Sequence, residues 1–254
     1  MIYGNTDREW ERFGATDPYY GVLTEEKYRK GNLTPKAKEA FFKSGEEYIA
    51  QVMASIRKHL DSSYTPRKVL EFGCGVGRLV IPLAKLAERV VGIDISESMI
   101  AEAKRNCESV SIRNVTFLRC DDELSQLLGE KYDLVHSYTV FQHLSVRRGE
   151  AIFKRLLEHL ENGGVCVVHF TYAKGSKVRI ASPWIKSHIP LTKNLINLIR
   201  GRAFFAPQMV MNCYDLNRLL SLVQQQQVRE FYVEYTDHGG ELGILLYFRK
   251  PELS

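Results

Sequence analysis

Apolar residues recur every three or four positions in one early part of the chain, which is the period of an amphipathic helix. The recurring positions are Phe41, Gly45, Tyr48, Val52, Ile56 and Leu60. Thr34 and Pro35 just before them supply a capping residue and a proline at the first helical position. The spacing therefore predicts a helix over about residues 35–60.

From residue 68 onward, short and continuously apolar runs replace the helical spacing. Seven runs indicate strands, at residues 68–72, 89–94, 115–120, 132–138, 163–170, 228–236 and 243–250. Helices are expected at residues 78–87, 96–106, 147–161 and 212–224. Apolar strands separated by helices are typical of a parallel sheet with both faces covered. Asp237–Gly240 joins the last two runs as a hairpin turn, so the final strand is expected to be antiparallel.

Two regions interrupt this alternation. Residues 1–33, here called the lid, are rich in aromatic side chains, and with the helix at 35–60 they form an expected N-terminal unit, residues 1–60. The core is expected over residues 61–254. It contains a stretch, residues 173–211, with seven Lys or Arg residues and no Asp or Glu. This stretch, here called the basic insertion, is too long for an ordinary connection.

The first expected strand meets a glycine loop with the sequence EFGCGVG, residues 71–77. A dinucleotide fingerprint needs the spacing GxGxxG, whereas here Arg78 stands where the last glycine would fall. A phosphate-binding P-loop is excluded because no GK[ST] follows. Glu71 precedes the first glycine at the end of the strand, and this acidic position separates the loop from both alternatives.

This pattern resembles the first motif of the class I S-adenosylmethionine (SAM) dependent methyltransferases, E/D-x-G-x-G-x-G. The resemblance continues in two further acidic positions: Asp94 ends the second expected strand, and Asp121 follows the third, with Asp122 beside it. It implies an α/β, Rossmann-like fold with a seven-stranded, mostly parallel sheet, helices on both faces, an N-terminal helical lid and an insertion after strand five. It also implies SAM as cofactor and S-adenosylhomocysteine (SAH) as product.

The resemblance assigns a role to each part of the motif. The glycines let the backbone approach the amino-acid and ribose parts of SAM closely. Asp94 is suited to accept hydrogen bonds from the ribose hydroxyls, and Asp121 or its neighbour from the adenine amine. Glu71 is expected to orient the loop or the ammonium group. The full set of expected cofactor residues is Glu71, Gly73, Cys74, Gly75, Gly77, Arg78, Asp94, Ile95, Asp121, Asp122 and Ser137.

Titratable side chains at the carboxyl ends of later strands are the candidates for work on the acceptor. Methyl transfer needs in-line alignment, and an amine or hydroxyl acceptor also has to lose a proton. The candidates are Tyr138, His143, His169 and His238. Each also has a plain structural interpretation, as a packed core residue, a helix cap or a turn residue. No motif selects one general base.

Composition and charge limit the class of protein and its cellular compartment. The chain has 254 residues, a net charge of +5, and five cysteines without a CxxC pair, which argues against a disulfide framework or a zinc site. The N-terminus has no signal-peptide pattern and no apolar run reaches the roughly 20 residues of a membrane span, so a cytoplasmic location is expected.

The acceptor class is the open question. SYTV stands where DNA or glutamine amino-methylating enzymes carry [DN]PP[YF], no Pro-Cys pair for cytosine methylation occurs, and no RNA-binding module is visible, so nucleic acid is disfavoured. The texture of residues 10–48 and 209–220 is similar to bacterial methyltransferases of glycan biosynthesis, which implies a sugar hydroxyl acceptor, anionic or lipid-linked.

Two other functions stay open: methylation of RNA or protein docked on the basic insertion, and a non-catalytic SAM-binding module. The basic insertion also fits a peripheral membrane contact. Its apolar residues fit a homodimer surface equally well.

Overall fold

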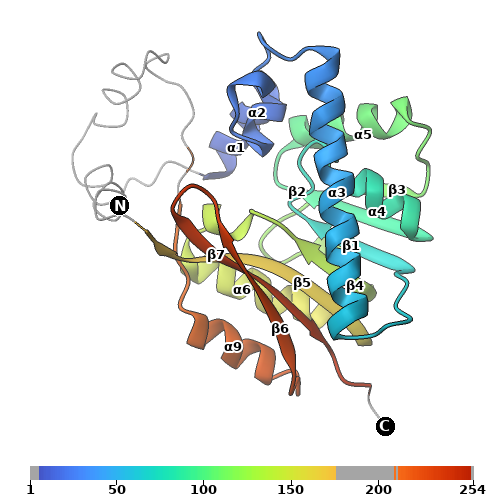
Figure 1. Cartoon of the computed structure of the whole chain (residues 1–254), viewed down its shortest axis with the longest axis vertical. Coiled ribbons are helices and arrows are strands. Elements are labelled where there is room, and N and C mark those ends of the chain that lie inside the picture. Colours follow the sequence, from blue (N-terminus) through green and yellow to red (C-terminus); the bar gives the residue numbers. More distant parts are fainter. Residues whose placement is uncertain (1–5, 176–208, 210, 253–254) are drawn as a thin grey trace.

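Seven strands form one mixed sheet in the centre of the protein (Figure 1). The computed structural model describes residues 6–175, 209 and 211–252. The strands are β1 (Lys68–Phe72), β2 (Arg89–Asp94), β3 (Val115–Arg119), β4 (Tyr132–Ser137), β5 (Leu160–Lys174), β6 (Phe231–Asp237) and β7 (Glu241–Arg249). Their order across the sheet is β3-β2-β1-β4-β5-β7-β6.

Six strands run parallel and β7 runs against them. β7 pairs antiparallel with both β5 and β6, so it lies between these two strands and not at the edge of the sheet. The expected class, a seven-stranded mostly parallel sheet whose last strand is antiparallel, is confirmed. Because β6 is parallel to the first five strands, the turn that follows it lies at the same edge as the loops after β1, β2 and β4.

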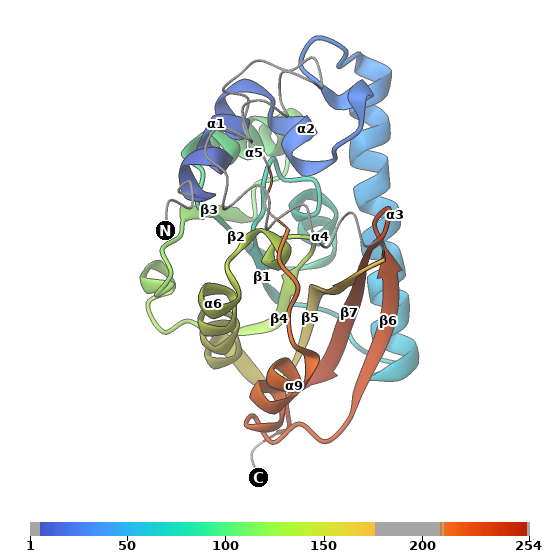
Figure 2. The same cartoon turned by 90° about the vertical axis from the view of Figure 1, so that its left-hand side faces the viewer.

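Helices cover both faces of the sheet (Figure 2). The helical elements are α1 (Thr6–Thr16), α2 (Pro18–Val22), η1 (Glu26–Tyr28), α3 (Pro35–His59), α4 (Val80–Leu86), α5 (Glu97–Ser109), η2 (Ser125–Leu127), η3 (Phe141–His143), α6 (Val146–His159) and α9 (Leu216–Gln224). The apolar residues of α6 and α9 pack on one face, and those of α3 and α4 pack on the other. The alternate residues of the central strands are buried on both sides, as continuously apolar runs require.

The helix at Pro35–His59 begins where its sequence predicts. The Thr34 side chain accepts a hydrogen bond from the Ala37 N–H, and Pro35 occupies the first turn. Gly45 lies in the middle of this helix, where glycine costs about 1 kcal/mol relative to alanine. A Cβ there would lie 2.4 Å from the Arg78 carbonyl oxygen, so glycine is what lets α3 pack directly on the end of the glycine loop.

The lid is helical over α1, α2 and η1, although its sequence shows no clean helical period. These elements are short, and they are held by contacts with the core. The Glu11 carboxylate accepts hydrogen bonds from the hydroxyls of Ser96 and Ser98 at the start of α5. Arg148 of α6 binds Asp7 at 2.6 Å. Tertiary contacts of this kind stabilise short helices that propensity alone does not.

Two predicted boundaries are wrong. The helix expected from residue 212 begins at Leu216 with Asp215 as its cap, and the Asn212 side chain donates to the carbonyl oxygens of Gln142 and Leu144. The helix expected over 147–161 ends at His159, and its last two expected residues belong to the irregular start of β5. There the Gly163 N–H donates to the Lys250 carbonyl, so the backbone is satisfied by the chain that follows β7.

Most of the basic insertion, residues 176–208 and 210, lies outside the described residues. Its expected roles as a docking surface, a membrane contact or a dimer surface therefore stay predictions. In the described part of the chain, no helix is both long and apolar enough to cross a membrane.

Candidate functional site

The glycine loop turns sharply after β1 and brings its backbone to the carboxyl edge of the sheet. Gly73 has a φ of +74°, which lies in the left-handed region that favours glycine. A Cβ at this position would lie 2.3 Å from Cγ2 of Val140, far inside van der Waals contact. The N–H groups of Gly73 and Cys74 donate to the Ile93 carbonyl at 2.8 and 3.0 Å, which ties the loop to β2.

Asp94 connects this loop to the next helix. Its Oδ2 accepts from the Gly75 N–H and its Oδ1 from the Ser96 N–H, each at 2.9 Å. Burial raises the pKa of the Asp94 carboxyl, and the two backbone N–H groups oppose this shift because they stabilise the charged form. The carboxylate is thus fixed in orientation beside the loop, at the wall of a cavity.

The two acidic residues after β3 have different partners. Asp121 accepts hydrogen bonds from the N–H and hydroxyl of Ser125, which lower the pKa of its carboxyl, and it lines the cavity. Asp122 also lines the cavity, but Arg148 binds its carboxylate at 2.7 Å. Since Arg148 also binds Asp7, the Asp122 carboxylate helps to hold the lid on the core.

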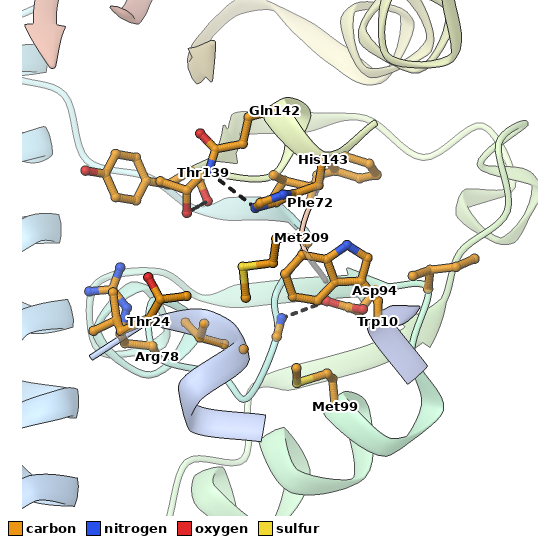
Figure 3. A pocket seen from close by; sticks show the side chains of 18 of the residues that line it. Trp10, Thr24, Phe72, Arg78, Asp94, Met99, Thr139, Gln142, His143 and Met209 are labelled. Atoms are coloured by element: carbon orange, nitrogen blue, oxygen red, sulfur yellow. Dashed lines mark hydrogen bonds between the residues drawn. The ribbon is translucent and has the colours of Figure 1, made fainter. Parts of the chain in front are cut away.

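The cavity has a volume of about 650 Å³ and lies between the lid, the glycine loop and the ends of β4 and β6. This size falls within the range of about 300–1,000 Å³ that is typical of small-molecule sites. Trp10 of α1 and Met209 project into it above Asp94, and His143 lies next to Trp10, higher in the view (Figure 3). Residues of the lid therefore form one wall of the cavity, and Met209 and Met211, at the end of the basic insertion, also border it.

The bend after β4 is strained. Thr139 has a φ of +59°, which is a true outlier for a β-branched residue, and its hydroxyl donates to the Tyr138 carbonyl at 2.7 Å. Tyr138, Thr139 and Val140 all line the cavity. Strain of this kind concentrates at functional sites, and here it accompanies a bend that places three successive residues on the cavity wall.

Tyr138 forms a cluster with two of the candidate histidines. Its hydroxyl lies 3.4 Å from Nε2 of His238, and its ring makes edge contacts with the rings of His169 and His238. Burial lowers the pKa of His238 below its usual 6.5, partly opposed by Asp237. A lowered pKa keeps this imidazole neutral at pH 7 and able to accept a proton.

His169 lies behind this cluster and not on the cavity wall. Its side chain is fully buried, its Nε2 is 2.8 Å from the Thr236 hydroxyl, and burial lowers its pKa to about 3. The expected role of His169 beside the acceptor stays a prediction, although its buried side chain lies behind Tyr138 and not on the cavity wall. A neutral, buried imidazole in van der Waals contact with Tyr138 and His238 supports their positions instead.

A buried chain of hydrogen bonds connects Glu71 to the cavity. Parallel pairing of β1 and β4 places Glu71 opposite His136, and Glu71 Oε2 lies 2.5 Å from His136 Nδ1. On the other side of the ring, His136 Nε2 lies 3.1 Å from the hydroxyl of Tyr48, which lines the cavity. An ionised carboxylate only accepts hydrogen bonds, so the proton of this contact is on Nδ1 of His136. Nε2 can then accept a hydrogen bond from the Tyr48 hydroxyl.

His143 ends the short helix η3 at the other side of the cavity. Its ring makes an edge contact with Trp10, with the ring centroids 4.8 Å apart, and its Nε2 lies 3.3 Å from Nε2 of Gln142. It lines the cavity near Asp94 (Figure 3), so it is placed to contact a ligand.

The structure thus brings most of the predicted site residues to one cavity. Those on its wall are Gly73, Gly75, Arg78, Asp94, Ile95, Asp121, Asp122, Tyr138, His143 and His238. The cavity wall does not include Glu71, Cys74, Gly77, Ser137 or His169. Glu71 binds His136 and not the loop, and the Ser137 hydroxyl donates to the Phe72 carbonyl at 2.9 Å, so both residues brace β1 against β4.

Sequence reasoning missed several wall residues. The helical spacing places Tyr48 only on the apolar face of the helix Pro35–His59, and no motif marks Met99, Thr139 or Gln142, which also line the cavity. One signal was available for Tyr48: it is a polar-tipped aromatic in an apolar stripe, and such a residue needs a hydrogen-bond partner when it is buried.

A sheet of this order, a glycine loop after its first strand and a carboxylate after its second define the class I SAM-dependent methyltransferase fold. Residues 69–164 match the sequence family described as "Methyltransferase domain". The resemblance drawn from the sequence is therefore confirmed over residues 69–164, the part of the chain that matches this family.

Individual relatives agree with this class. The malonyl-[acyl-carrier protein] O-methyltransferase of Bacillus cereus is 32% identical over 122 residues, which are 47% of this chain and 43% of that protein. The chain thus spans less than half the length of this curated relative.

Two crystal structures have the same fold. Magnesium protoporphyrin IX methyltransferase from Synechocystis with bound SAM has a TM-score of 0.61 at 18% identity, covering 98% of this chain and 99% of that one. The N-methyltransferase NodS from Bradyrhizobium japonicum in complex with SAH has a TM-score of 0.59 at 17% identity, covering 98% of this chain and all of that one.

Proposed function

We propose that the protein is a SAM-dependent methyltransferase whose cofactor lies along the glycine loop. The observation that carries this proposal is the Asp94 carboxylate, held at the cavity wall by the N–H groups of Gly75 and Ser96. Each carboxylate oxygen has a second acceptor site, so Asp94 can receive both ribose hydroxyls while it keeps its backbone bonds. Asp121, also on the wall, is placed to accept from the adenine amine.

The reaction itself needs little from the protein besides geometry. A nucleophilic atom of the acceptor attacks the methyl carbon, the carbon–sulfur bond breaks, and the sulfonium becomes the neutral thioether of SAH. Alignment of the acceptor with that bond is the main source of acceleration. Trp10 and Val22 of the lid and Met209 at the end of the basic insertion line the cavity and are placed to exclude water.

The proton of a hydroxyl acceptor has three possible receivers on the cavity wall. His238 is neutral at pH 7 and lies beside Tyr138. Tyr48 is the second, because its hydroxyl is bonded to Nε2 of His136, whose Nδ1 is bonded to Glu71. His143 is the third and lies on the opposite side. General-base assistance of this kind contributes about 10²–10⁴-fold to rate.

The acceptor that we propose is a small molecule or glycan with a free hydroxyl, methylated in the cytoplasm. A cavity of about 650 Å³, shared with the cofactor, has the size of a small-molecule site, and this favours a small acceptor over a folded macromolecule. The relative from Bacillus cereus acts on a malonyl group of an acyl-carrier protein, according to its name. Methylation of RNA or protein would require a docking surface on the basic insertion.

Calorimetric titration with SAH tests the cofactor assignment. Asp94→Ala removes the charged acceptor for the ribose, which is worth about 1.5–3 kcal/mol and corresponds to about a 10- to 150-fold loss of affinity. Asp215→Ala is the matched control, because Asp215 also accepts a backbone N–H but caps α9 away from the cavity. Equal SAH affinity in wild type and Asp94→Ala would show that Asp94 is not the ribose ligand.

A further inference from the structure

Arg78 is a buried cation on the cavity wall. It follows the glycine loop directly, its side chain is only 6% exposed, and it lines the cavity near Ser44, Tyr48 and Tyr138. Figure 3 shows it at the end of the cavity away from Trp10 and Asp94. The backbone of Arg78 packs directly against Gly45 of α3, and this close contact fixes where the Arg78 side chain begins.

The guanidinium has few partners for a buried charge. Its Nη1 donates to the Ser44 hydroxyl at 3.3 Å, and its Nε is buried without a hydrogen-bond partner. In the described part of the chain, no carboxylate lies within the 4.0 Å of an ion pair with Arg78. Residues 1–5 and 176–208 contain no Asp or Glu. The nearby buried carboxylate, Glu71, is bonded to His136.

This arrangement costs stability unless a ligand completes it. Burial lowers the pKa of Arg78, yet a guanidinium stays protonated in proteins, so an incompletely paired cation remains on the cavity wall. The phenol groups of Tyr28, Tyr48 and Tyr138 lie near it, and burial raises the pKa of Tyr48 and Tyr138, which keeps these two phenols neutral. The planar fork of arginine matches the two oxygens of a carboxylate or phosphate.

We propose that Arg78 is the binding group of an anion subsite between α3 and Tyr138, which takes a carboxylate or phosphate of a ligand in the cavity. The subsite rests on the proposed function, since the cavity is the one assigned to cofactor and acceptor. Two ligands there carry such a group: the methionine end of SAM, through its carboxylate, and an anionic acceptor. Either anion supplies the hydrogen-bond acceptors that the guanidinium lacks.

Arg78→Met tests the subsite, since it removes the charge and keeps an apolar stem. If the buried charge serves a ligand and not folding, its replacement by an apolar side chain should leave the stability of the protein unchanged or raise it. Arg148→Met is the matched control, because Arg148 also lines the cavity but is bonded to Asp7 and Asp122. We expect the thermal midpoint to fall in Arg148→Met and not in Arg78→Met.

Calorimetry with three probes then identifies the anion. If the subsite holds the cofactor carboxylate, Arg78→Met weakens SAH about 10- to 100-fold and leaves unchanged a decarboxylated SAH analogue that lacks only the carboxylate. If it holds an acceptor anion, SAH binds Arg78→Met normally, but inorganic phosphate binds the SAH complex of wild type and not that of the variant.

Wild-type affinities for SAH, the analogue and phosphate in Arg78→Met would overturn the subsite. A wild-type protein that binds no SAH would instead contradict the proposed function. In that case, phosphate titrations of the ligand-free wild type and variant still decide the role of Arg78: equal affinity overturns it, and loss in the variant supports it.

Discussion

The close approach of Gly73 to Val140 makes a sharp prediction about the glycine loop. Replacing Gly73 by alanine introduces two separate costs. Its φ of +74° lies in the left-handed region, which costs about 1–2 kcal/mol for any residue with a Cβ. The new methyl group would also lie 2.3 Å from Val140 Cγ2, against an ordinary carbon–carbon separation of about 3.5–4.0 Å. Overpacking of this kind costs about 1–3 kcal/mol.

The chain contains a matched control for the first of these costs. Gly129 has a φ of +75°, and a Cβ there would meet nothing within 4 Å. Gly129→Ala should therefore lower the free energy of unfolding by about 1–2 kcal/mol, and Gly73→Ala by about 2–5 kcal/mol. The double variant Gly73→Ala with Val140→Ala should recover part of the difference, because it removes the methyl groups that clash.

Urea unfolding gives the free energy of unfolding of both variants, and titration with SAH gives their affinity for the ligand. Since the loop or Val140 has to move to relieve the contact, Gly73→Ala should also weaken SAH, whereas Gly129→Ala should bind it as wild type does. Equal unfolding free energies for the two single variants would show that Gly73 is not crowded by Val140 and would refute this account of the loop.

Two further predictions concern the lid and the proton path. Burial opposes ionisation of Glu11, but hydrogen bonds from Ser98 and Ser96 outweigh it and lower its pKa, so its stabilising contribution is complete above its unfolded value and is lost as the pH falls through the folded one. Glu11→Gln should thus lower the thermal midpoint at pH 7, and this difference should shrink as the pH falls below the ordinary range of a glutamate and through the lowered pKa of Glu11; a difference that stays constant with pH would contradict the lid contact. Tyr48→Phe keeps the ring against Tyr138, 4.2 Å between centroids, yet removes the hydroxyl bonded to His136, so turnover should fall about 100-fold or more with SAH affinity unchanged. Full turnover in that variant would exclude Tyr48 as a proton receiver.

Much of the fold could be predicted from local signals. The strands of the core are short apolar runs, and a buried parallel strand has this pattern because both of its faces are covered. The glycine loop and Asp94 are adjacent to their strands, so their positions follow from the order of elements. The lid helices were not predictable in this way, because contacts such as Glu11 with Ser98 hold them in place.

The acceptor side of the site depends on pairings that the sequence does not show. His136 lies within an apolar strand and is buried, and its bond to Glu71 follows from the register of β1 against β4. Tyr48 reaches the same ring from a helix 88 residues earlier in the chain. The burial of His169 behind Tyr138 likewise depends on the position of β7 between β5 and β6.

The central claim is methyl transfer from SAM, and transfer of a labelled methyl group tests it most directly. The protein is incubated with SAM tritiated in the methyl group and with fractionated cell extract, and the labelled product is then identified. The account predicts label in a small molecule or glycan, lost in Asp94→Ala and retained in Asp215→Ala. A protein that binds SAH but transfers no label to any fraction would contradict the claim that it is an enzyme, and label in RNA or protein would contradict the acceptor class.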